Sequence, residues 1–120
     1  MSPVQHRVSG AALSFDLAQE MDTVRRELAG QSGRVARTLV KEGPLRITLV
    51  GVKAGGTVQL HTADGPISVQ GVEGEIEVDA NGRIWTLGPG ALLVLEAGVP
   101  HSVRSGTGGF FLLTVVATAV

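Results

Sequence analysis

Three histidines are the side chains in this sequence best suited to acid–base or metal chemistry. His6 lies in the N-terminal segment, whereas His61 and His101 each lie beside a short apolar run and a turn. An imidazole can act as a general base near neutral pH, and it is also the commonest metal ligand in proteins. The chain has no cysteine, so disulfides and thiolate metal sites are excluded. The candidate chemistry therefore centres on His61 and His101, and His6 is expected to lie on the surface.

The segments that would hold these histidines are short and are separated by glycine and proline. Nine runs are predicted to be strands: 35–41, 45–54, 57–62, 67–70, 75–79, 83–87, 91–95, 101–104 and 110–116. Many short strands at close, even spacing are typical of a sandwich or barrel rather than of βαβ units. Asn81-Gly82 separates two of these runs and favours a hairpin, because both residues tolerate positive φ angles.

One helix is predicted, over residues 16–29, after an N-terminal arm of residues 1–15. Four apolar residues follow helical spacing and form one stripe: Leu17, Met21, Val24 and Leu28. Asp16 with Gln19 three residues later resembles a capping box, and Gly30 stands where a left-handed residue often ends a helix. We expect the stripe to pack against the outside of a sheet, although a partner-binding helix is an alternative.

Four acidic residues alternate with small or apolar ones between positions 73 and 79. They are Glu73, Glu75, Glu77 and Asp79. Because side chains along a strand alternate between its two faces, all four carboxylates are predicted to share one face. This face could bind calcium or a basic partner, but a solvated outer face that resists aggregation is the favoured interpretation.

Two segments resemble the paired sequence motifs of the cupin family. Residues 55–74, GGTVQLHTADGPISVQGVEG, follow the spacing of the first motif, with matches at Gly55, His61 and Gly74. Residues 90–105, GALLVLEAGVPHSVRS, follow that of the second, with matches at Gly90, Gly98 and His101. The resemblance covers about residues 40–116. It implies a small single-domain, cupin-2-like protein. Its fold would be an all-β, antiparallel jelly-roll barrel (double-stranded β-helix) over about residues 34–116, preceded in the sequence by one short helix.

The departures from these motifs concern the metal site that the resemblance implies. The family's site has three histidines and one glutamate, of which His61 and His101 are retained. Ala63 stands at the second histidine position and Ile67 at the glutamate position. Since catalytic zinc normally has three protein ligands, the motif is interpreted as a degenerate metal site. No cofactor is expected, although residual binding of Zn, Ni, Mn or Fe by the two histidines is an alternative.

The resemblance also places a ligand pocket in the barrel. His61, Ala63, Ile67 and His101 are predicted to line it. Alternation adds neighbouring residues to the predicted lining: Val58, Val69, Leu92, Val94 and Leu112. A small, mostly apolar pocket with two polar groups suits a small organic ligand.

Composition narrows the partners, and three functions stay open. Lys and Arg total 10 and Asp and Glu total 11, and Trp85 is the single tryptophan, so nucleic-acid binding is not expected. The longest apolar run, 110–120, is too short to span a bilayer, and a cytoplasmic location is expected. A homodimer is predicted because edge strands such as 35–41 need cover. The open functions are small-molecule binding without metal, a metal-dependent dioxygenase or isomerase, and a structural or dimerisation module; whether the protein is an enzyme stays undecided.

Overall fold

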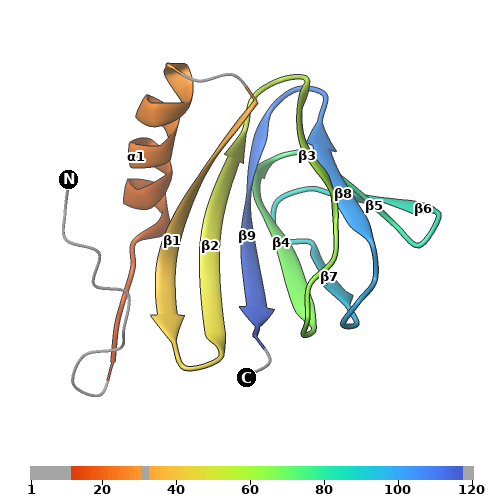
Figure 1. The fold of residues 1–120 in the computed structure, drawn as a ribbon. Helices are drawn as coiled ribbons and strands as arrows, with labels where there is room; N and C mark the ends of the chain where they lie inside the picture. The colour runs from red at the N-terminus through yellow and green to blue at the C-terminus, as the bar shows by residue number, and fades with distance from the viewer. Residues whose placement is uncertain (1–11, 31–32, 118–120) are drawn as a thin grey trace.

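The computed structural model describes residues 12–30 and 33–117, and within them the chain forms one helix and nine strands (Figure 1). The helix is α1 (Leu17–Ala29). The strands are β1 (Arg34–Glu42), β2 (Leu45–Val52), β3 (Gly56–His61), β4 (Ile67–Gly74), β5 (Ile76–Ala80), β6 (Arg83–Leu87), β7 (Leu92–Leu95), β8 (His101–Ser105) and β9 (Gly109–Val116). Each of the nine runs predicted from the sequence coincides with one of these strands. The predicted arm lies outside the described residues over positions 1–11.

The strands form two antiparallel sheets that face each other across an apolar core. One sheet has the order β1-β2-β9-β4-β7, and the other has the order β3-β8-β5-β6. The chain therefore crosses repeatedly between the sheets, as in a jelly roll, and the predicted all-β architecture is confirmed. The hairpin at Asn81-Gly82 is confirmed as well, since these residues have φ angles of 53° and 75° and join β5 to β6.

Helix α1 covers part of the outer face of the five-stranded sheet, as its apolar stripe predicts (Figure 1). Val24 is completely buried, and it packs in one cluster with Leu49 and Phe110. Gly51 of β2 permits this close approach, because a β-carbon there would lie 2.8 Å from the Phe110 ring and 2.9 Å from Val24.

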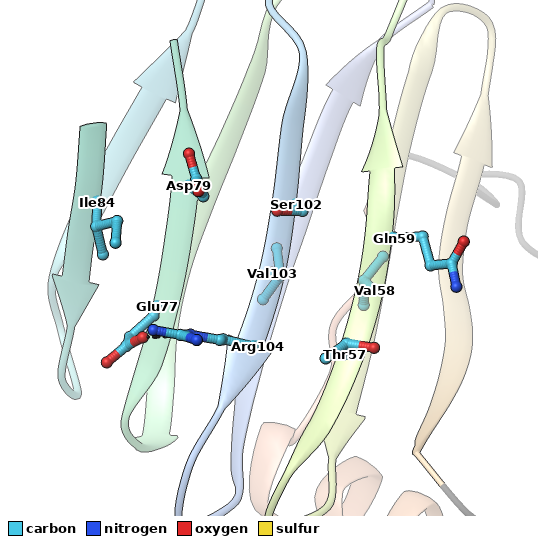
Figure 2. A pocket seen from close by; sticks show the side chains of 9 residues that line it. All are labelled: Thr57, Val58, Gln59, Glu77, Asp79, Ile84, Ser102, Val103 and Arg104. Atoms are coloured by element: carbon cyan, nitrogen blue, oxygen red, sulfur yellow. Dashed lines mark hydrogen bonds and ion pairs between the residues drawn. The ribbon is translucent and has the colours of Figure 1, made fainter. Parts of the chain in front are cut away.

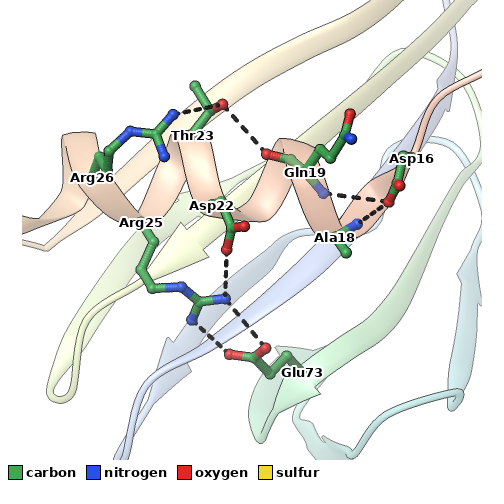
Figure 3. Close-up of polar contacts among 8 residues, drawn as sticks. All are labelled: Asp16, Ala18, Gln19, Asp22, Thr23, Arg25, Arg26 and Glu73. Carbon is green, nitrogen blue, oxygen red and sulfur yellow. Dashed lines mark hydrogen bonds and ion pairs between the residues drawn. The ribbon is translucent and has the colours of Figure 1, made fainter.

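Both ends of α1 are capped by hydrogen bonds, from a side chain at the start and from the backbone at the end. The carboxylate of Asp16 accepts hydrogen bonds from the backbone N–H groups of Ala18 and Gln19 at 3.0 and 3.3 Å (Figure 3). The expectation of a left-handed residue at Gly30 is wrong, because its φ is −96°. Gly30 instead donates its N–H to the carbonyl of Glu27, which tightens the last turn.

The expectation that four carboxylates share one strand face is also wrong. The segment divides at Gly74, whose φ of 70° lets the chain leave β4 and enter β5 in the opposite sheet. Glu73 stays on β4 and binds Arg25 of α1, with Nη1 2.8 Å from Oε2 (Figure 3). Glu77 and Asp79 lie instead on the outer face of β5.

Three residues predicted to line the barrel face away from it. Leu92 and Val94 are 61% and 65% exposed, whereas the alternate residues Leu93 and Leu95 are buried in the core. Leu112 packs in the cluster beneath α1. The reason is that β7 and β9 carry apolar residues on both faces, so composition does not reveal which alternate set faces inward.

Candidate functional site

The two candidate histidines lie side by side on neighbouring antiparallel strands. His61 is the last residue of β3 and His101 is the first residue of β8, and they are direct partners in the register. Their ring centroids are 4.1 Å apart, and the ring planes meet at 62°. The register of the two strands shifts between Val58 and His61, so a local irregularity lets both residues face the space between the sheets.

Each imidazole is held by a hydrogen bond from Nδ1 to a backbone carbonyl two residues earlier. His61 donates to Gln59 at 2.8 Å, and His101 donates to Val99 at 2.9 Å. Since a carbonyl oxygen can only accept, the proton of a neutral ring lies on Nδ1 in both cases. The lone pair is then on Nε2, which makes no hydrogen bond within the described chain. The site therefore offers two neighbouring Nε2 acceptors.

The two rings differ in depth. His101 is only 3% exposed, whereas His61 is exposed. Among the described residues, no fully buried side-chain nitrogen or oxygen lacks a partner, so the Nε2 of His101 keeps some accessible surface. A ligand would thus meet His61 at the entrance and His101 further in.

A cavity of about 160 Å³ lies between the two sheets at this histidine pair. Its wall is mainly apolar and comes from both sheets: Val50, Val58, Val69, Val103, Phe111 and Leu113. The polar side chains on the wall, besides the histidines, are Arg34 and Thr48. Such a space is of the size that accepts a small organic molecule.

Ala63 and Ile67 lie near the histidines in sequence but do not line this cavity. Ile67 is 3% exposed and belongs to the core cluster that includes Val69 and Leu95. Ala63 packs against the same cluster, and its carbonyl accepts a hydrogen bond from Gly98 at 2.9 Å. The two positions that hold metal ligands in the motif therefore extend the apolar core here.

Ser105 ends the segment that resembles the second motif, and its side chain has a structural role. It is 1% exposed, donates a hydrogen bond to the carbonyl of Glu75 at 2.6 Å and accepts one from the N–H of Gly108 at 2.9 Å. These bonds tie the β8–β9 turn to the start of β5.

The donor set does not fit a catalytic metal. The two imidazoles supply two ligands, and within the described residues no group of three or more His, Cys, Asp or Glu side chains could hold a metal ion. Catalytic zinc sites use three protein ligands, and the common mononuclear iron site adds a carboxylate to two histidines. The absence of any cofactor stays a prediction.

A second hollow, of about 240 Å³, lies on the outer face of the four-stranded sheet (Figure 2). Figure 2 shows Arg104 extending across it to Glu77, and their Nε and Oε1 atoms are 2.6 Å apart. The guanidinium of Arg104 is thus already paired with a carboxylate of the protein. The cavity between the sheets is the better candidate because its imidazole Nε2 atoms have no such partner in the part of the chain that the structure describes.

Arg34, Thr48 and Phe111 line the cavity but were not among the site residues predicted from the sequence. Arg34 and Ala36 are two residues apart on β1, so they share the face that looks into the barrel. Strand alternation was the available signal, but it identifies two faces without saying which one is inside. In the described part of the chain, no helix is long and apolar enough to cross a membrane.

Comparison with solved structures identifies the fold. The structure is similar to that of a conserved protein of unknown function from Streptococcus pyogenes, with 25% identity and a TM-score of 0.74 over 100% of this chain and 98% of that one. It is also similar to a cupin superfamily protein from Desulfitobacterium hafniense, with 16% identity and a TM-score of 0.70 over 74% of this chain and 83% of that one. No protein-family model and no curated protein sequence matches the chain.

The chain therefore has the jelly-roll fold of cupin proteins, which agrees with the fold that the sequence resemblance implies. A further similar structure is salicylate 1,2-dioxygenase from Pseudoaminobacter salicylatoxidans, solved with gentisate, with 19% identity and a TM-score of 0.76. That match covers 85% of this chain but 32% of the dioxygenase.

Proposed function

We propose that this cupin domain binds a small organic molecule in the cavity between its sheets, at His61 and His101, without a resident metal. The carrying observation is the pair of imidazoles beside an apolar wall: their Nδ1 atoms are fixed to carbonyls, and their Nε2 atoms have no partner among the described residues. Apolar walls with a few oriented polar groups are the usual composition of small-molecule sites.

The volume and the donor set support binding over metal-dependent catalysis. A cavity of about 160 Å³ is close to one that holds a benzene ring, for which about 150 Å³ suffices. The dioxygenase with similar structure was solved with an aromatic acid, which makes such molecules sensible members of a screen. The fold itself names no substrate, because one fold hosts many chemistries.

The test is a thermal-shift and NMR screen of small acids, sugars and phenolics against the wild type and two variants. Val58→Phe places a ring in the cavity, since Val58 lines it from β3. Thr57→Phe is the matched control, because it adds the same ring to the next residue on the opposite, exposed face of that strand. We expect hits that bind the wild type and Thr57→Phe equally and fail to bind Val58→Phe.

Other results would favour the competing functions. Hits that bind Val58→Phe as well as the wild type would refute binding in this cavity. A complete absence of hits would favour a structural or dimerisation module. Stoichiometric metal in the purified protein would favour the metal-dependent enzyme.

A further inference from the structure

The lining of the cavity also includes a cation, Arg34. Arg34 is the first residue of β1, and it lines the cavity on the same strand face as Ala36. The start of β1 lies beside the start of β3, because the carbonyl of Gly33 approaches Gly56 closely. His61 ends β3, five residues further on, which is about 15 Å along the strand direction. The backbone of Arg34 thus lies near the opposite end of β3 from His61, and both side chains line the cavity.

This cation has no counter-ion within the described part of the protein. Among those residues, Arg34 makes no ion pair or hydrogen bond, whereas Arg25, Arg37 and Arg104 each bind a glutamate. None of the cavity-lining residues in the described chain is an aspartate or glutamate. An anionic group of a ligand would therefore find an unpaired guanidinium and no repelling carboxylate. Guanidinium is well suited to a carboxylate, because its N–H groups can bind both oxygens.

From this arrangement we propose that the ligand is a small hydroxy acid: a carboxylate at Arg34, an apolar body about the size of one six-membered ring, and a hydroxyl at the histidines. The Nε2 lone pair of one histidine accepts the single hydrogen bond that the hydroxyl can donate, and the valines and Phe111 contact the apolar body. This assignment of ligand class rests on the proposed binding function.

The experiment measures binding of three probes by calorimetry. The first, 4-hydroxybenzoate, has both end groups; 4-hydroxybenzamide lacks the negative charge; and benzoate lacks the hydroxyl. Each probe is titrated into the wild type, Arg34→Gln, Arg34→Lys and the charge control Arg46→Gln. Arg46 is a suitable control because it lies on β2, away from the cavity lining, and its guanidinium donates to the backbone carbonyl of Leu45.

We expect 4-hydroxybenzoate to bind about fivefold more tightly than either other probe, because the amide lacks the charge that pairs with the exposed Arg34 and benzoate lacks the neutral hydrogen bond to a histidine. Arg34→Gln should remove the advantage of the acid over the amide. Arg34→Lys should keep most of it, and Arg46→Gln should keep all of it. Added salt should weaken binding of the acid and leave the amide unchanged, because Arg34 is exposed.

Two results would overturn the proposed ligand class and leave the binding function standing. In the first, 4-hydroxybenzamide binds the wild type as tightly as 4-hydroxybenzoate does. In the second, Arg34→Gln binds 4-hydroxybenzoate with unchanged affinity. In both cases Val58→Phe must still abolish binding. Failure of all three probes to bind the folded wild type would overturn the ligand class as well. The broader screen of acids, sugars and phenolics then decides the binding function separately.

Discussion

Rebuilding the missing half of the metal-binding pattern tests how this barrel departs from the cupin motifs that its sequence resembles. The double substitution Ala63→His and Ile67→Glu adds an imidazole and a carboxylate at the two motif positions that now carry apolar side chains. Neither position lines the cavity now, but Ile67 lies two residues before the cavity-lining Val69 on β4 and therefore shares its inner face. If both new side chains reach His61 and His101, the four together make a closed metal site. We expect the variant to bind nickel, manganese or zinc tightly and the wild type to bind them weakly or not at all.

The magnitude follows from the burial of Ile67. This side chain is 3% exposed in the core, and complete burial of an isoleucine contributes about 1.5–3 kcal/mol. A glutamate at this depth without a partner costs a further ~1–3 kcal/mol. Without metal the variant should therefore lose about 2.5–6 kcal/mol, a large share of the ~5–15 kcal/mol that holds a domain folded.

Metal should restore much of this stability, because it binds the folded state. At a concentration about a thousand times the Kd, a ligand adds ~4 kcal/mol. At about 4 °C per kcal/mol for a chain of this size, the melting temperature of the variant should rise by roughly 16 °C when metal is added. Thermal melts of the wild type and the variant, each with and without metal, provide the measurement.

Two outcomes would contradict this expectation. No metal-dependent rise in the double variant would show that positions 63 and 67 are not aimed at the histidine pair. A comparable rise in the wild type that disappears in His61→Ala would show that the native protein binds metal through His61 together with ligands outside the four motif positions.

Three further predictions concern stability and assembly. The hydrogen bond from Arg25 lowers the pKa of Glu73 below the ordinary value of a glutamate. This exposed pair should therefore add up to ~1 kcal/mol to the free energy of unfolding at neutral pH, and this contribution is lost as pH falls through the folded-state pKa of Glu73. Urea titrations should show that Glu73→Gln is less stable than the wild type at pH 7 and equally stable once Glu73 is protonated. Gly71→Ala should unfold the protein or lower its melting temperature sharply, because the new β-carbon would collide with the carbonyl of Gly88; an unchanged melt would contradict the packing of β4 against that turn. A homodimer is predicted from the unpaired edge of β1, and light scattering that returns a monomer mass at micromolar and higher concentrations would refute it.

The strands and the helix could be predicted because their signals are local. Glycine and proline mark the ends of the strands, and Asp16 begins α1 where a capping side chain is expected. The faces of β7 and β9 could not be predicted, because Leu92 and Leu93 are equally apolar and only the tertiary fold separates them. The break at Gly74 was missed because alternating acids continue through it, whereas the chain changes sheet there.

Part of the candidate site was predictable because its signal also lies in short segments of the sequence. Motif spacing brought His61 and His101 together correctly, and the structure makes them register partners. Arg34 could not be found this way, since its place at the cavity depends on β1 lying beside β3 at the edge of the barrel. When a side chain reaches a site through a contact between strands that are distant in sequence, the neighbouring residues do not predict it.

The position of β9 constrains how the protein is made. This strand comes last among the described elements, yet it lies in the middle of the five-stranded sheet, between β2 and β4. During synthesis, β2 and β4 therefore keep open edges until residues 109–116 have left the ribosome, and the larger sheet closes only then. Pairing over such sequence separations is slow, so the nascent chain passes through an interval in which its unpaired edges are open to aggregation or chaperone binding.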